Sequence, residues 1–252
     1  MGQEFIVKIL AVDTSTLTGS VALLFEEEKQ LKTIGEITLS VSVVHSERLL
    51  PAIQRLLEEA GASLAEIDLF GVAHGPGSFT GLRIGMATVQ GLSLSTGKPA
   101  VGVSSLETLA MNAVLHDGLV VPMFDARRGE VYSAVYKANG ARPRGLESVE
   151  PEVAVSPEKF LELLSLRDEP TFLMIGRGAE VYRTVILERL GSRALFAPAL
   201  LNIPRASHVG LLAWEGASEN RPARENPLSP RYLRSAEVTF PKPTKILSNH
   251  FG

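Results

Sequence analysis

The stretch VKILAVDTSTLTGSVALLF, residues 7–25, contains two apolar runs separated by a polar turn that begins at Asp13. Apolar and β-branched runs bounded by turn residues predict two β-strands. A second stretch, GLVVPMFDARRGEVYSAVY at residues 118–136, repeats this arrangement and places Asp125 at the end of its first run. The repetition predicts a duplicated α/β unit, and therefore two lobes that face each other.

Further elements complete two such units. We expect strands at 30–40, 68–75, 99–105 and 171–176, and helices at 45–61, 80–95, 156–164, 178–190 and 206–218. The sequence SLAE at 63–66 has the capping-box pattern that opens a short helical turn. Residues 138–150 are polar and contain glycine, which predicts a loop. We expect an N-terminal lobe at 1–105 and a C-terminal lobe at 106–252.

Composition narrows the class of protein. The chain has 252 residues, a net charge of -3 and no cysteine. Without an overall basic field, this chain is not expected to be the main contact for RNA. The missing cysteines exclude disulfides and thiolate metal sites. No signal peptide pattern and no apolar run of membrane-spanning length is present, so we expect a cytoplasmic protein without a membrane segment.

A glycine-rich segment begins with HGPGSFTGLRIG at residues 74–85. It lacks the lysine with which a Walker loop neutralises phosphate charge. Gly75 and Gly77 fit a dinucleotide fingerprint, but Thr80 occupies the position of its third glycine. Both phosphate motifs therefore fail, although backbone amides at a helix start can bind an anion in a generic way.

Helical spacing divides the same segment into two faces. Gly81, Gly85 and Thr88 form a stripe of small residues, and a second stripe is apolar. Small residues allow a neighbouring helix to approach closely. The small-residue face either packs against this chain's own sheet or helix 45–61, or docks another chain, and spacing does not decide between the two.

Other candidate chemistry is limited. Asp13, Thr14 and Ser15 form a turn with one acid and two hydroxyl groups, and actin-like kinases bind magnesium and phosphate at such a turn. The simpler interpretation is a turn whose side chains hydrogen-bond to its own backbone. The five histidines never fall three or four residues apart, so no helix offers a paired-histidine metal site. Ser78 lacks the setting of a nucleophile elbow.

Several motifs together resemble one known family. In chain order they are ILAVDTST, HSERLLPAI, GPGSFTGLRIGMATVQGLSL, GVSSLETLA, DARRGEVYSAVY and SPRYLR. This set resembles the bacterial TsaB (YeaZ) family over nearly the whole chain, most densely at residues 7–136. The resemblance implies an actin-like (ASKHA, ribonuclease H-like) ATPase fold and a role in making threonylcarbamoyladenosine in tRNA.

The resemblance also implies partners. TsaB-like proteins pair with a catalytic paralogue, TsaD, and a small ATPase, TsaE, binds the pair. ATP and a divalent metal are expected on those partner subunits and not on this chain alone, and tRNA is expected to be reached through the complex. A homodimer through the same surface is expected when the partner is missing.

The catalytic paralogue carries a segment resembling G-V-N-H-x-E-G-H, whose two histidines hold a metal ion. Aligned with GVSSLETL at 102–109, this chain has Ser105 and Leu109 at the histidine positions, although Glu107 is retained. A hydroxyl and an isobutyl group cannot replace two imidazoles around a divalent cation. The resemblance therefore implies a non-catalytic chain, and it argues against a metal-dependent protease.

The resemblance assigns the docking surface to helices 45–61 and 80–95. The expected interface residues are Ser46, Leu49, Leu50, Ile53, Gly81, Leu82, Gly85, Thr88 and Val89. A vestigial phosphate site is expected at Asp13, Thr14, Ser15, Gly75, Gly77 and Asp125. Arg83, Arg127 and Arg128 are candidates for polar contacts with the partner or tRNA, although an ordinary surface arginine is the simpler account of each.

One alternative of a different class stays open. A small-molecule kinase or ATPase of the same fold would use Asp13 and Asp125 to coordinate magnesium. Such an enzyme would bind ATP as a single chain, whereas a scaffold subunit would not.

Overall fold

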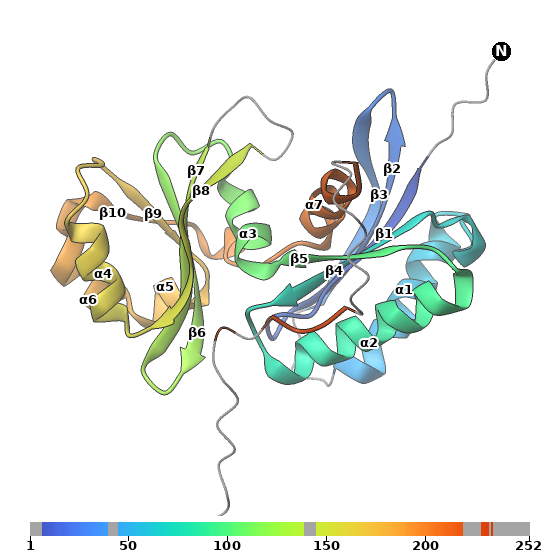
Figure 1. Ribbon diagram of the computed structural model, residues 1–252, viewed down its shortest axis with the longest axis horizontal. Coiled ribbons are helices and arrows are strands. Elements are labelled where there is room, and N and C mark those ends of the chain that lie inside the picture. The colour runs from blue at the N-terminus through green and yellow to red at the C-terminus, as the bar shows by residue number, and fades with distance from the viewer. Residues whose placement is uncertain (1–6, 40–44, 139–144, 219–227, 232, 234–252) are drawn as a thin grey trace, which may run out of the picture.

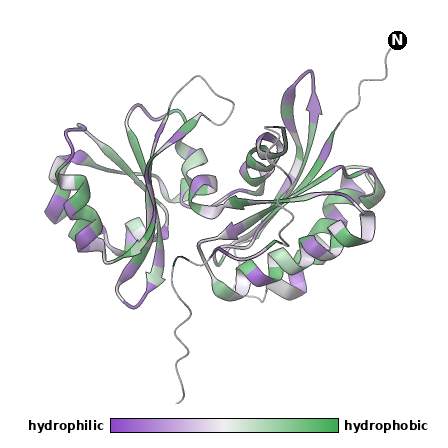
Figure 2. Cartoon of the chain, viewed as in Figure 1, coloured by the Kyte–Doolittle hydropathy of each residue, from purple (hydrophilic) through white to green (hydrophobic). Residues whose placement is uncertain are grey.

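The computed structural model describes residues 7–39, 45–138, 145–218, 228–231 and 233 (Figure 1). These residues form two α/β lobes that lie side by side, each around a five-stranded sheet. Apolar residues concentrate in the central strands and on the helix faces that cover them, whereas hairpin tips are hydrophilic (Figure 2). The hydrophobic effect therefore places one sheet at the centre of each lobe.

The first sheet has the strand order β3-β2-β1-β4-β5. Its strands are β1 (Lys8–Asp13), β2 (Gly19–Glu27), β3 (Gln30–Leu39), β4 (Leu69–Gly75) and β5 (Ala100–Ser104). The first three strands are antiparallel, and β4 and β5 run parallel to β1. At the β2–β3 tip, Glu28 and Lys29 have φ values of 53° and 61°, which is the backbone of a tight two-residue hairpin.

The second sheet repeats this plan. Its strands are β6 (Leu119–Arg127), β7 (Glu130–Ala138), β8 (Leu146–Val155), β9 (Phe172–Ile175) and β10 (Ala194–Phe196). Their order, β8-β7-β6-β9-β10, and their directions match those of the first sheet. The predicted duplication of an α/β unit in the actin-like fold class is confirmed.

Helices cover the faces of both sheets. Their bounds are α1 (His45–Glu59), α2 (Phe79–Thr96), α3 (Ser105–Ala110), α4 (Pro157–Ser165), α5 (Arg177–Val181), α6 (Arg183–Leu190) and α7 (Ala206–Ser218), with short 3-10 turns η1 (Leu64–Glu66), η2 (Met111–Ala113), η3 (Gly191–Arg193) and η4 (Ala199–Leu201). Helices α1 and α2 pack on one face of the first sheet. Helix α7 covers its other face, and α3 contacts both sheets between the lobes. None of the helices in the described part of the chain is long and apolar enough to cross a membrane.

Local sequence signals explain several helix starts. The Ser156 hydroxyl accepts a hydrogen bond from the Lys159 amide at 3.4 Å, and Pro157 occupies the first helical position of α4, as predicted. At the predicted capping box the Ser63 amide donates to the Glu66 carboxylate at 2.7 Å. Helix α1 begins at His45, one residue before the expected cap Ser46, whose side chain lies outside the described residues.

The prediction of a loop across 138–150 was wrong in part. Residues 146–150 begin strand β8, which pairs with β7 at the edge of the second sheet. Its polar residues Glu147 and Ser148 are exposed, so the strand lacks the apolar alternation that would predict it. Pro151 lies within this strand, which is tolerated at a sheet edge because an outward-facing N–H there has no partner to lose.

Helix α7 lies in the sequence region assigned to the C-terminal lobe but packs on the first sheet. A Cβ atom at Gly71 of β4 would lie 3.0 Å from the Ala213 Cβ, so the glycine allows the helix to approach closely. Val209, Leu212 and Ala213 are all buried in the same apolar cluster as Ile9. The core of the first lobe is therefore completed by residues from late in the chain.

We expect Leu212→Ala to lower the free energy of unfolding by about 2–5 kcal/mol, because it leaves a cavity beneath α7. Leu200→Ala is the matched control, since Leu200 is 83% exposed, and it should change stability by about 0.5 kcal/mol or less. Urea unfolding curves measure both values. Equal effects of the two substitutions would contradict the packing of α7 described above.

Candidate functional site

The glycine-rich start of α2 is in direct contact with the turn after β1. A Cβ atom at Gly81 would lie 2.0 Å from the Thr14 carbonyl oxygen, and one at Gly85 would lie 2.3 Å from Thr14 Oγ1. The Thr14 hydroxyl donates to the Gly81 carbonyl at 2.7 Å. A Cβ at Gly77 would lie 2.4 Å from the Ser15 carbonyl oxygen. Only glycine permits this approach of two backbone segments.

The same contact determines whether a phosphate fits at the start of α2. The Ser78 amide donates to the Ser15 carbonyl at 2.7 Å, and the Gly81 amide donates to the Ser78 hydroxyl at 3.2 Å. These amides are therefore occupied, and carbonyl oxygens of Thr14 and Ser15 face the helix. A phosphate needs amide donors and is repelled by carbonyl oxygens, so these residues do not fit one.

Asp13 and Asp125 occupy equivalent positions in the two lobes. The Asp13 carboxylate is 1% exposed, and its Oδ1 accepts from the Ser15 amide at 2.9 Å and the Ser15 hydroxyl at 2.8 Å. In the second lobe, Asp125 Oδ1 accepts from the Arg127 amide at 2.8 Å. Each aspartate therefore closes its own turn, as the simpler interpretation of the sequence predicted.

Ser105 and Leu109 both lie on the buried side of α3. The Ser105 hydroxyl accepts a hydrogen bond from the Gly75 amide at 3.2 Å. Leu109 is fully buried, and a Cβ atom at Gly176 would lie 2.6 Å from its Cδ2. These positions serve packing between the lobes. Among the described residues, no group of three or more histidine, aspartate or glutamate side chains is arranged to hold a metal ion.

The burial of the docking residues that the resemblance implied differs from what a docking surface requires. Six of them are buried within the first lobe, against its sheet or the turn after β1: Leu49, Ile53, Gly81, Leu82, Gly85 and Val89. Those residues cannot contact a partner while the lobe stays folded. A charged substitution at Gly85 would therefore disturb the core at Thr14 before it affected any interface. Leu50 is exposed and Thr88 is half-buried, and the Ser46 side chain lies outside the described residues.

The outward face of α2 is a different stripe. Its exposed residues are Phe79, Thr80, Arg83, Ala87, Gly91, Leu94 and Ser95. Arg83 is the only charged residue in this 18-residue helix, and its guanidinium carbon lies 3.7 Å from the centre of the Phe79 ring. Leu94 is 85% exposed, and nothing lies within 4 Å of a Cβ atom at Gly91. A solvated helix normally carries charges on its outer face, so this composition is typical of an interaction surface.

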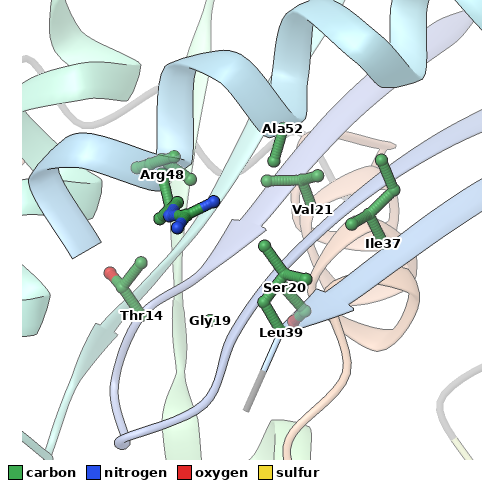
Figure 3. A pocket seen from close by; sticks show the side chains of 9 residues that line it. Thr14, Gly19, Ser20, Val21, Ile37, Leu39, Arg48 and Ala52 are labelled. Carbon is green, nitrogen blue, oxygen red and sulfur yellow. The ribbon is translucent and has the colours of Figure 1, made fainter. Parts of the chain in front are cut away.

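A small hollow lies at the start of α1, between that helix and strands β2 and β3 (Figure 3). Its lining residues are Thr14, Gly19, Ser20, Val21, Ile37, Leu39, Arg48, Leu49 and Ala52. The hollow has a volume of only about 20 Å³ and is open to solvent, far below the ~300–1,000 Å³ typical of small-molecule sites. A hollow of this size does not accommodate a nucleotide.

Arg127 and Arg128 form the tip of the β6–β7 hairpin. Both are exposed, and their φ values of 65° and 55° are uncommon for residues other than glycine. The hairpin therefore holds two adjacent guanidinium groups at the surface of the second lobe. Arg83 lies on α2 of the first lobe, whereas this hairpin belongs to the second lobe.

Known proteins resemble both the sequence and the structure. Residues 33–242 match the family model described as TsaD, tRNA N6-adenosine threonylcarbamoyltransferase. The tRNA threonylcarbamoyladenosine biosynthesis protein TsaB of Bacillus subtilis is 38% identical over 231 residues, which cover 91% of this chain and 95% of that protein. Its counterpart in Escherichia coli is 32% identical over 235 residues, which cover 90% and 95%.

The chain belongs to the TsaB family.

The solved structure of YeaZ from Pseudomonas aeruginosa supports the same assignment. It superposes with a TM-score of 0.71 at 30% identity, covering 90% of this chain and 100% of that one. The resemblance read from the motifs is thereby confirmed. The match to the TsaD model begins within β3 and covers the later strands of both sheets.

Gly81→Ala should destabilise this TsaB-family chain by about 1–3 kcal/mol, because its methyl group would collide with the Thr14 carbonyl. Gly91→Ala is the control on the same helix. It should stabilise the chain by about 0.5–1 kcal/mol, because alanine favours a helix interior and the space there is open. Denaturant titrations of both variants test this contrast. If both substitutions changed the free energy of unfolding in the same direction, the contact between α2 and the Thr14 turn would be contradicted.

Proposed function

We propose that this chain is the non-catalytic scaffold subunit of the bacterial complex that synthesises threonylcarbamoyladenosine in tRNA. It pairs with a TsaD-like catalytic paralogue, and a TsaE-like ATPase binds the pair. ATP and the divalent metal are bound by those partner subunits, and tRNA is reached through the complex in the cytoplasm. Without its partner, the chain can pair with a second copy through the same surface.

The observation that carries this proposal is that α3 packs two buried side chains at the positions where a metal site is expected. Ser105 and Leu109 occupy the positions at which the resemblance places the metal-binding histidines of the paralogue. Here they are fully buried and take part in contacts between the lobes. A metal centre at this place would require two imidazoles where the chain has one packed hydroxyl and one packed aliphatic group. The start of α2 supports the same conclusion, because the amides of Ser78 and Gly81 are occupied by the chain itself.

The docking surface in this proposal is the outward face of α1 and α2. On α2 it comprises Phe79, Ala87, Gly91 and Leu94, and on α1 it includes Leu50, which is 53% exposed. The small side chains at 87 and 91 allow the backbone of a partner helix to come close. Arg83 lies on the same face, and we assign it a polar contact with the partner.

Arg127 and Arg128 are assigned a different role. They lie at an exposed hairpin tip, where two guanidinium groups can contact successive phosphates of tRNA bound to the complex. The net charge of -3 agrees with a supporting contact of this kind rather than a principal one.

Reconstitution tests the scaffold role directly. Supplied with an activated threonylcarbamoyl donor, the purified chain should neither hydrolyse ATP nor transfer threonylcarbamoyl groups to tRNA adenosine, whereas its mixture with the TsaD-like and TsaE-like proteins of the same organism should do both. Modified tRNA is measured after digestion to nucleosides. Turnover by the isolated chain would overturn the proposal.

Ala87→Arg should weaken binding to the TsaD-like paralogue by at least about tenfold, or about 1.4 kcal/mol. Its side chain would place a charge in the centre of the docking face without entering the core, because Ala87 is exposed. Ala199→Arg, at an exposed position in η4 of the other lobe, is the control. Isothermal titration calorimetry measures both affinities. Equal affinity for the two variants would contradict the assignment of α2 to the interface.

The kinase alternative has one structural feature in its favour, the equivalent placement of Asp13 and Asp125. It predicts that ATP and magnesium raise the melting temperature, since ligand at about one hundred times Kd stabilises a protein by about 2.7 kcal/mol. The scaffold proposal predicts no shift. A shift that disappears in Asp125→Ala would favour the kinase.

A further inference from the structure

A short segment near the C-terminus returns to the first lobe. The Gln90 side chain of α2 donates to the Leu228 carbonyl at 2.9 Å, and the Arg231 amide donates to the His74 carbonyl at 2.8 Å. A Cβ atom at Gly75 would lie 2.8 Å from the Arg231 carbonyl oxygen. The segment 228–231 therefore follows the end of β4 and the side of α2 at backbone contact distance (Figure 1).

The side chain of Arg231 reaches the other lobe. Its Nη1 lies 3.0 Å from Oε2 of Glu152 on β8. The Arg231 side chain is 46% exposed, whereas that of Glu152 is only 6% exposed. The backbone of this residue is thus bonded to the first lobe and its charge to the second.

Glu152 receives two more groups. The Ser104 hydroxyl, at the end of β5 in the first lobe, and the Tyr136 hydroxyl, at 3.4 Å on β7, both donate to its Oε1. Burial, followed by the charges of Glu152 and Glu107, raises the pKa of Tyr136 well above its ordinary value. The phenol therefore stays protonated and can donate. One buried carboxylate collects contacts from both sheets and from the returning segment.

Removing the cationic partner of a buried carboxylate destabilises the folded protein, because the remaining charge is left without compensation. The contacts of Glu152 with Ser104 and Arg231 exist only when β8 faces the ends of β4 and β5, so their energy depends on how the lobes are oriented. Helix α3 packs on β6 and β7 and forms one connection between the lobes. The Arg231–Glu152 pair adds another at β8, the neighbouring edge strand.

We propose that residues 228–231 are a strap that fixes the angle between the two lobes by pairing Arg231 with Glu152. This goes beyond the proposed function, because it concerns the isolated chain and requires no partner. The strap holds the lobes in one orientation in the absence of any ligand.

Distance measurements between the lobes test the strap. The chain has no cysteine, so a pair of spin labels can be attached at Ser95→Cys on α2 and Ser192→Cys in η3, two exposed positions. Pulsed electron paramagnetic resonance on the full chain should give one narrow distance distribution. In Arg231→Gln and in Glu152→Gln the distribution should broaden and shift.

Glu150→Gln is the matched control. Glu150 lies on the same strand and pairs with Arg167 at 2.5 Å within the second lobe, so its loss should leave the distance distribution unchanged. Arg231→Gln decides the question even if Glu152→Gln does not fold, because Arg231 is half exposed. An unchanged distribution in Arg231→Gln, or the same broadening in Glu150→Gln, would overturn the proposal.

Discussion

The close contact between the turn after β1 and helix α2 is the constraint on which the first lobe depends. Thr14 and Ser15 approach the helix so closely that positions 77, 81 and 85 must be glycine. The close approach allows hydrogen bonds between the turn and the helix, from the Thr14 hydroxyl to the Gly81 carbonyl and from the Ser78 amide to the Ser15 carbonyl. A phosphate site would need those same amides. The geometry that stabilises the lobe therefore occupies the groups that a nucleotide would use.

Duplication gives the second lobe the same plan but different contacts. In each lobe an aspartate closes its own turn, Asp13 at the end of β1 and Asp125 near the end of β6. The lobes meet through α3, where the Ser105 hydroxyl and the Leu109 side chain are packed in the interior. Because these residues are buried in the interior, only residues on the surface can contact a partner. The outward face of α2, with its single charge, is the most distinctive part of it.

The sequence predicted the sheets, most helices and the family because those features depend on local periodicity and on dense motifs. Ser156 with Pro157, and Ser63 with Glu66, are local signals that the structure reproduces. The orientation of α2 was not predictable, because Gly81 and Gly85 fit equally well a face packed on the chain's own turn or one packed on a partner. Strand β8 lacks alternation because it lies at an edge. The ion pair between Arg231 and Glu152 joins residues that are distant in the sequence, so no local sequence pattern predicts it.

Helix α7 has a consequence for how the protein is made. The strands of the first sheet are complete once Ser104 has been synthesised, but the residues that cover one of its faces are in α7, at 206–218. At about 5–20 residues per second, a ribosome needs roughly 5 to 20 further seconds to add them. During that interval the nascent sheet exposes an apolar face that binds chaperones or aggregates. The order of elements along the chain thus makes the first lobe the last to finish folding.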